Sequence, residues 1–177
     1  MCIRDRYFIA LNLGNNMKWI SICSFCLFLY SFGASAVSLQ IAFLGYSNHH
    51  VDRNYDYNEN HKLIGFSINN GFSAAHFINS YNNNSTLIGW NFRMDNDLKI
   101  QKLSFRLGAM VGVVTGYEQE QIITYINDDI SLYLIPQLTL SYPVTDTISI
   151  SLVNGIVPDS KGVIFMHHLQ LSFDDLF

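Results

Sequence analysis

Apolar and small polar residues alternate along most of the chain that follows Ala36. The clearest alternation lies in residues 87–94, where the apolar members are Ile88, Trp90, Phe92 and Met94. Because successive side chains of a strand point to opposite faces, this period of two indicates strands with one apolar and one polar face. Only a helix or a closed barrel satisfies all backbone polar groups in lipid, and no segment after Ala36 is long and apolar enough for a spanning helix. The pattern is typical of a membrane-spanning β-barrel.

Residues 17–36 have the features of a secretory signal peptide. Met17-Lys18-Trp19 is a short positive start, residues 20–32 are an apolar run, and Ala34-Ser35-Ala36 supplies the small residues that signal peptidase requires. The alternative is an uncleaved anchor helix, but the apolar run is short for a bilayer. We therefore expect cleavage after Ala36, interpret residues 1–16 as a non-native leader, and assign residues 37–177 to an outer-membrane β-barrel.

Cysteine content and charge narrow the class of protein. All three cysteines, Cys2, Cys23 and Cys26, lie in the part that we expect to be removed, so the remaining chain has no disulfide. Small secreted soluble domains often depend on disulfides, which mildly favours a barrel. Residues 37–177 carry seven Lys and Arg against thirteen Asp and Glu, a net charge of −6. This charge argues against nucleic acid as a partner.

The alternation predicts an all-β fold, an eight-stranded antiparallel transmembrane β-barrel. The expected strands are 37–43, 64–69, 72–78, 87–94, 98–115, 134–141, 148–152 and 165–173. Short turns near residues 70, 96 and 144 alternate with long polar loops at 48–62, 79–84 and 117–129, as in barrels with one rim in the periplasm and one outside. The alternative is a soluble, lipocalin-like barrel with its apolar face turned inward.

Candidate functional residues come from two of the long loops. His49-His50 opens the first loop, Tyr57-Asn58-Glu59 follows in it, and Asn79-Ser80 opens the second loop. In this layout the chain resembles the outer-membrane lipid A palmitoyltransferases (the PagP type). In that family a His after the first strand and an Asp-Ser pair after the third strand form an extracellular active site, with a Tyr-Asn-Glu segment between them.

The resemblance implies acyl transfer from a phospholipid to a lipopolysaccharide-type acceptor. By position, His50 corresponds to the family's His and Ser80 to its Ser, while Asn79 stands where the family has Asp. His50 would act as the base, Ser80 as a hydroxyl donor or nucleophile, and Asn79 as an amide donor toward the oxyanion. The chain also departs from the family at Val37, where the first strand begins without the family's amphipathic helix. Solvated loop histidines and ordinary turn chemistry at 79–84 are the alternative explanations.

Proline and glycine positions suggest how a lipid would enter. Pro136 falls inside an expected strand, and proline belongs at strand edges or bulges because it lacks an N–H donor. The resembled family uses prolines to open a lateral gap, and Pro136 is the candidate here, whereas Pro143 and Pro158 are expected in turns. Glycines on the polar face would leave space for an acyl chain or simply let a narrow barrel close: Gly65, Gly89, Gly108 and Gly112.

The resemblance implies an acyltransferase, and the signal peptide and the alternation predict a place in the outer membrane of a Gram-negative bacterium, with a phage-encoded protein of this kind as the other source. Its expected partners are membrane phospholipid and lipopolysaccharide, with no nucleic acid, no cofactor and no metal, and the expected state is a monomer. Two alternatives remain open: a non-catalytic small barrel with a structural or surface-binding role, and a soluble periplasmic ligand-binding barrel. The acidic residues of the loop at 117–129 are expected to be solvated.

Overall fold

The computed structural model describes residues 37–177 apart from 53, 70, 95–96, 119–123, 128–129, 160 and 177. Contacts divide the chain into units of residues 1–35 and 36–177, and all described residues belong to the second. The expected leader and signal peptide, the turn residues 95–96 and the acidic residues 128–129 lie outside the described residues. Among the described residues there is no helix long and apolar enough to cross a membrane.

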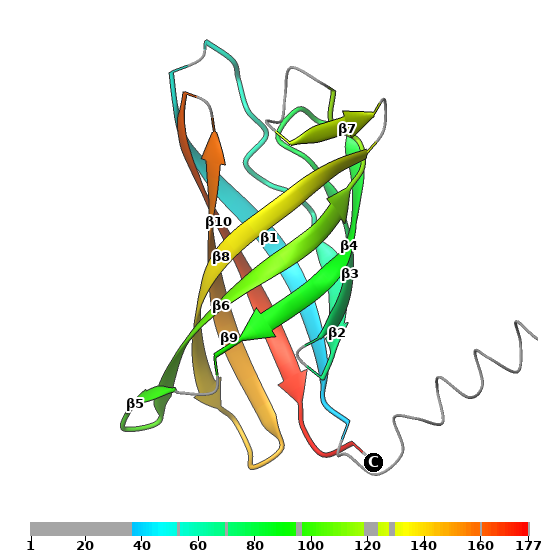
Figure 1. The fold of residues 1–177 in the computed structure, drawn as a ribbon. Helices are drawn as coiled ribbons and strands as arrows, with labels where there is room; N and C mark the ends of the chain where they lie inside the picture. Colours follow the sequence, from blue (N-terminus) through cyan, green and yellow to red (C-terminus); the bar gives the residue numbers. More distant parts are fainter. Residues whose placement is uncertain are drawn as a thin grey trace, which may run out of the picture. The chain divides into compact units, whose positions relative to one another are not determined.

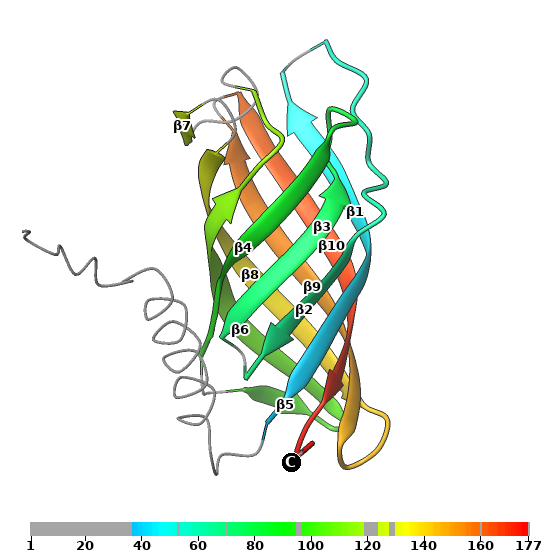
Figure 2. The same ribbon diagram turned by 90° about the vertical axis from the view of Figure 1, so that its right-hand side faces the viewer.

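Eight long antiparallel strands form a closed barrel (Figures 1 and 2). The ring runs β1-β2-β3-β4-β6-β8-β9-β10 and closes where β10 pairs with β1. Short strands β5 and β7 add to β6 and β8. The bounds are β1 Leu39–Val51, β2 Ile64–Ile68, β3 Phe72–Ile78, β4 Asn84–Arg93, β5 Leu98–Ile100, β6 Leu103–Val114, β7 Tyr125–Asn127, β8 Ile130–Pro143, β9 Ile148–Asp159 and β10 Gly162–Phe173. The all-β, eight-stranded antiparallel barrel predicted from the alternation is confirmed.

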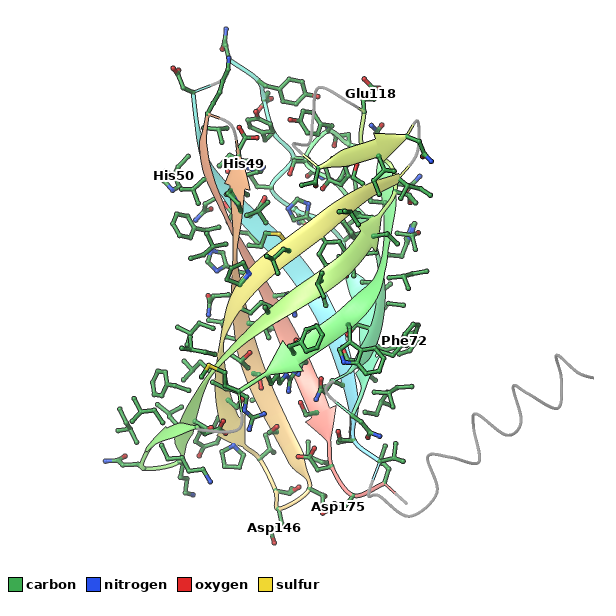
Figure 3. All side chains as sticks on the ribbon, in the orientation of Figure 1. His49, His50, Phe72, Glu118, Asp146 and Asp175 are labelled. Atoms are coloured by element: carbon green, nitrogen blue, oxygen red, sulfur yellow. The ribbon has the colours of Figure 1, made fainter. Side chains whose placement is uncertain are left out.

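The two ends of the barrel differ in their connections. The end that carries residues 52–63 and 79–83 is called the loop end, and the end that carries residues 144–147 is called the turn end (Figure 1). The first and last described residues meet at the turn end, where the N–H of Leu176 donates to the carbonyl of Val37 at 3.0 Å. Figure 3 shows Glu118 at the loop end and Asp146 and Asp175 at the turn end.

The outer surface of the barrel is apolar and its interior is largely polar. On β8 the outward Leu134 is 62% exposed, whereas the inward Ser131 is only 1% exposed. The same alternation repeats around the ring, with inward polar residues that include Gln40, Ser67, Ser73, Asn91, Gln137, Thr139, Ser151, Gln170 and Ser172. A soluble barrel has the reverse arrangement, because water favours polar side chains outside.

A bulge at Leu44 changes which residues of β1 face inward. Phe43 pairs with Leu169 and Tyr46 pairs with His167, so two residues of β1 oppose the single residue 168 of β10. Leu44 has a φ of 54°, and an extra residue shifts the alternation by one position. A Cβ at Gly45, beside the bulge, would lie 2.8 Å from Cβ of Leu63, so only glycine fits there.

Several strand boundaries differ from the prediction. β1 continues through Val51 instead of ending near Phe43, because residues 162–166 of β10 pair with its polar second half. The expected single strand 98–115 is two strands, β5 and β6, joined by a turn at Gln101, where φ is 55°. A tight turn therefore lies at 101–102, within the expected strand, whereas residues 95–96 of the expected turn lie outside the described residues. Cross-strand pairing outweighs local composition in both places.

The backbone pairing between β8 and β9 stops near Pro136 and Pro158. It begins at the pair Gln137–Gly155 and continues toward the turn end, so residues 133–136 of β8 have no ladder partner on β9 among the described residues. Pro136 occupies the position next to this first pair, and its partner on the other side is Ala109 of β6. Pro158 lies inside β9 opposite Val163 of β10, which corrects the expectation that it forms a turn.

Candidate functional site

Asn79 organises the loop that carries Ser80. It is completely buried, and its Oδ1 accepts hydrogen bonds from the N–H groups of Tyr81 (2.9 Å) and Asn83 (3.0 Å). Its Nδ2 donates to Oγ of Ser85 (3.1 Å) and to the carbonyl oxygen of Gly116 (2.6 Å). Both amide hydrogens are therefore engaged within the protein, and the amide donor expected toward an oxyanion serves the loop instead.

His49 and Ser80 meet at the loop end. Nε2 of His49 lies 2.8 Å from Oγ of Ser80, and the two residues come from the second half of β1 and from the connection between β3 and β4. Nδ1 of His49 is buried and has no hydrogen-bond partner among the described residues. The pair is therefore a Ser–His dyad in which no carboxylate is hydrogen-bonded to the imidazole.

His50, the histidine named from the sequence, points the other way (Figure 3). Its ring is exposed and packs edge-on against Phe165 of β10, with ring centroids 5.7 Å apart. The bulge at Leu44 is the cause. An uninterrupted alternation that keeps Gln40 inward would also place residue 50 inward, but the extra residue moves His49 to that face. The structure thus brings Ser80 together with His49 and not with His50.

A second Ser–His pair supports the loop that covers the site. His61 Nε2 lies 2.7 Å from Oγ of Ser47, and its Nδ1 lies 2.8 Å from the carbonyl oxygen of Ile78. Since a carbonyl only accepts, Nδ1 carries the proton and the Ser47 hydroxyl donates to Nε2. Burial lowers the pKa of His61 below its ordinary value, so the ring stays neutral. This pair holds residues 58–61 between β1 and β3.

Four tyrosines gather around the dyad. Tyr57 stacks on His49 with ring centroids 4.2 Å apart and planes 5° apart. Tyr55 and Tyr81 pack on Tyr57 and on each other, and Tyr117 meets Tyr81 edge-on at 6.3 Å. Burial also raises the pKa of Tyr117, so its hydroxyl stays protonated. Together these rings form an aromatic wall around one side of His49.

The barrel contains a cavity of about 160 Å³ that reaches the dyad. His49, Ser80, Tyr57, Tyr81 and Tyr117 line it at the loop end. Beyond them its wall is a buried apolar cluster: Phe77, Leu87, Val114, Tyr133 and Ile135, with Met110 and Met166 packed against it. Toward the turn end its lining becomes polar, with Asn91, Gln137 and Gln170. Arg93 lies next to this polar end, since its guanidinium donates to Gln40 (2.7 Å) and Gln170 (3.4 Å).

A second hollow, more open and about 660 Å³ in volume, lies at the loop end. It is lined by residues 55–60 of the loop together with Tyr46 and His49. His49 and Tyr57 line both this hollow and the interior cavity. The dyad therefore stands between an enclosed, mostly apolar space and a polar one open to solvent.

Sequence reasoning identified Ser80 and the loop segment of Tyr57, chose His50 instead of its neighbour His49, and did not identify His61 or Ser47. Ser47 falls on the apolar face of an uninterrupted alternation, as His49 does, and the bulge that turns both residues inward has no clear mark in one sequence. No group of His, Cys, Asp or Glu side chains able to hold a metal ion occurs in the part of the chain that the structure describes. Neither a scan against protein-family models nor a search of curated proteins found a match for this chain.

Proposed function

We propose that this protein is an outer-membrane acyltransferase that moves a fatty acyl chain from a phospholipid to a lipid A-type acceptor. The observation that carries the proposal is the Ser80–His49 dyad at the mouth of an apolar cavity inside the barrel. The cavity suits an acyl chain, and the second hollow suits a polar acceptor. The hydroxyl of that acceptor must reach Nε2 of His49, which lies beside Ser80. The apolar outer surface supports a place in the membrane.

In the proposed chemistry the dyad carries the proton transfers and supplies the nucleophile. The Ser80 hydroxyl gives its proton to Nε2 of His49 while Oγ attacks the ester carbonyl of the phospholipid. That ester bond breaks, the leaving glycerol oxygen takes the proton from His49, and the acyl group remains on Ser80. An acceptor hydroxyl then passes its proton to Nε2 and attacks the acyl-serine, and Ser80 takes the proton back. One ester breaks and one forms, so the reaction requires no redox partner.

The interrupted ladder supports a lateral route for the lipid. A phospholipid in the outer leaflet reaches the interior cavity only through the barrel wall, and residues 133–136 of β8 lack ladder bonds to β9. Pro136 cannot donate a backbone hydrogen bond, which favours an interruption at this point. In this proposal the acyl chain passes between β8 and β9 while the headgroup stays outside.

The test is mass spectrometry of lipid A from cells that express the protein. The wild type is expected to add an acyl chain, and His49→Ala and Ser80→Ala are expected to lower the addition by about 100-fold or more, the usual contribution of a positioned base. His76→Ala, an exposed histidine of β3, is the matched control. If His50→Ala abolishes acyl addition and His49→Ala does not, His50 is the base, as the resemblance implies. No addition by a wild type that fractionates with the outer membrane and shows heat-modifiable gel mobility would eliminate the enzyme.

A second candidate function is a non-catalytic small outer-membrane barrel that binds a ligand at its loop end. The observation that favours it is the aromatic wall of Tyr55, Tyr57, Tyr81 and Tyr117 beside the open hollow. Aromatic faces of this kind suit sugars or other flat, partly apolar groups. This function predicts binding at the loop end that survives Ser80→Ala unchanged.

A further inference from the structure

The cavity wall holds two buried polar atoms without partners among the described residues. Tyr133 and Asn91 are 8% and 4% exposed, and both line the cavity. The hydroxyl of Tyr133 and Oδ1 of Asn91 have no hydrogen-bond partner among the described residues. Buried polar atoms are almost always hydrogen-bonded, so two unpaired atoms on one cavity wall point to a group that occupies the cavity.

Two paired glycines make room for the Tyr133 hydroxyl. Gly89 of β4 and Gly112 of β6 are direct neighbours, and a Cβ on them would lie 2.3 Å and 2.7 Å from the Tyr133 hydroxyl oxygen. Any other residue at either position would displace this hydroxyl. Asn91 follows Gly89 by two residues on the same inward face, a spacing of about 7 Å along a strand. The Tyr133 hydroxyl, which lies against Gly89, and the Asn91 side chain are therefore neighbours on the inward face of β4.

The two unpaired atoms are chemically complementary to one kind of group. The Tyr133 hydroxyl is able to donate a hydrogen bond, and Oδ1 of Asn91 only accepts. A methylene of a saturated chain would leave both unpaired, and a keto group would satisfy Tyr133 alone. A hydroxyl accepts from Tyr133 and donates to Asn91. Gln137 and Gln170 also line the cavity, so its wall remains polar toward the turn end.

We propose that the interior cavity selects acyl chains that carry a hydroxyl in their distal half, held between Tyr133 and Asn91. The inference rests on the proposed function, because it treats the cavity as the site of the acyl chain. It adds that the preferred acyl chain is hydroxylated. The apolar cluster around Phe77, Leu87 and Ile135 would hold the part of the chain next to the reacting ester. Tyr133 and Asn91 would then bind the hydroxyl of the chain.

The experiment measures binding and does not require turnover. The protein, placed in nanodiscs of ether-linked phospholipid that cannot donate acyl groups, is titrated with a fluorescent fatty acid probe. Saturated fatty acids then compete, either plain or with one hydroxyl or keto group at successive distal carbons. We expect one hydroxylated isomer to compete better than the plain chain by about threefold to tenfold for each hydrogen bond. The keto isomer is expected to fall between the two.

Two variants test the assigned atoms separately. Tyr133→Phe and Asn91→Leu are each expected to remove most of the preference for the hydroxyl while plain chains still bind. Tyr142→Phe, an exposed tyrosine on the outer surface, is the matched control and should keep the preference. If one variant fails to fold, as judged by heat-modifiable mobility, the other still decides.

The outcomes separate this inference from the proposed function. Equal or tighter binding of plain chains would overturn the hydroxyl preference, and water would then be the partner of Tyr133 and Asn91, while the acyl cavity stands. A preference unchanged in both variants would also overturn it. No competition by any fatty acid would overturn both the inference and the acyl cavity. Hydroxyl selectivity without acyl transfer to lipid A would keep the chain selectivity and remove the proposed reaction.

Discussion

The ring of Tyr57 lies parallel to the imidazole of His49, with the centroids 4.2 Å apart and the planes only 5° apart. Since Nδ1 of His49 has no partner among the described residues, this stacking and the Ser80 hydrogen bond are the contacts that hold the imidazole in place. The imidazole is thus held by stacking on its face, whereas in a Ser–His–Asp triad a carboxylate holds it by a hydrogen bond from Nδ1.

Replacing Tyr57 tests this orienting contact. Tyr57→Ala is expected to lower acyl transfer by about twofold to tenfold, because an aromatic pair contributes about 0.5–1.5 kcal/mol beyond its buried area. Tyr57→Phe keeps the stacked ring and should remain within about twofold of the wild type by the same reasoning. The measurement is lipid A mass spectrometry at matched expression. Equal loss in both variants would show that the phenol hydroxyl matters and not the stacking.

Asn79 is predicted to be a determinant of stability. Asn79→Ala removes four hydrogen bonds at a completely buried position and should lower the free energy of unfolding by about 2–4 kcal/mol. Denaturant titration of the protein in lipid vesicles measures this free energy of unfolding. The control is Asn83→Ala, whose side chain is exposed, with an expected change below about 0.5 kcal/mol.

Asn79→Asp is expected to destabilise the loop as well, although the resembled family has Asp at this position. A carboxylate accepts but does not donate, and the Gly116 carbonyl now 2.6 Å from Nδ2 would face a negative charge. The expected result is a lower free energy of unfolding and no gain in acyl transfer. Higher activity in Asn79→Asp would show that the loop rearranges to aim a carboxylate at His49.

Stability should fall in mild acid because of His61. Burial lowers its pKa in the folded protein below the ordinary value of 6.5. The unfolded chain therefore binds the proton more readily, so the stabilisation is complete above pH 6.5 and is lost as the pH falls toward the folded pKa. Unfolding midpoints across this range should fall less in His61→Gln, which does not titrate. Identical pH dependence in the two proteins would contradict the prediction.

A cross-link between β8 and β9 is expected to block the lipid route. Leu134 and Ile156 are outward residues on the unpaired parts of these strands, so cysteines there, joined by a bis-thiol reagent, would tie the strands together. Residues 37–177 contain no cysteine, so labelling is specific in a chain cleaved after Ala36. Acyl transfer should stop after cross-linking and return after cleavage of the linker.

The matched control cross-links Leu140 to Leu152, a directly paired position within the intact ladder. Because these strands are already joined there, activity should not change. Full activity with Leu134 and Ile156 joined would place the lipid route elsewhere in the barrel wall.

The fold class was predictable because a period of two is a local property. Each strand shows it without reference to its neighbours, as residues 87–94 do, and eight such segments with alternating short and long connections imply a closed antiparallel sheet. Ser80 was named from the resemblance, and its place directly after the third strand is a local property of the sequence. The polar lining of the interior follows from the same alternation.

The partner of Ser80 was not predictable, because it depends on one inserted residue. Leu44 looks like any other apolar strand residue, yet its bulge reverses the faces of His49 and His50. Likewise, the polar second half of β1 becomes strand only because β10 lies beside it, and the turn at Gln101 arises because β5 pairs back onto β6. These features depend on register between distant segments.

The sequence by itself determined that the chain forms strands with one apolar and one polar face, because the alternation of apolar and polar residues is a property of each short segment. Only the tertiary structure decided that the apolar face lies outside, that His49 and Ser80 meet, and that Tyr133 and Asn91 line one cavity. The physical reason is that inside and outside, and every contact across the lumen, exist only after the sheet closes and its register is set.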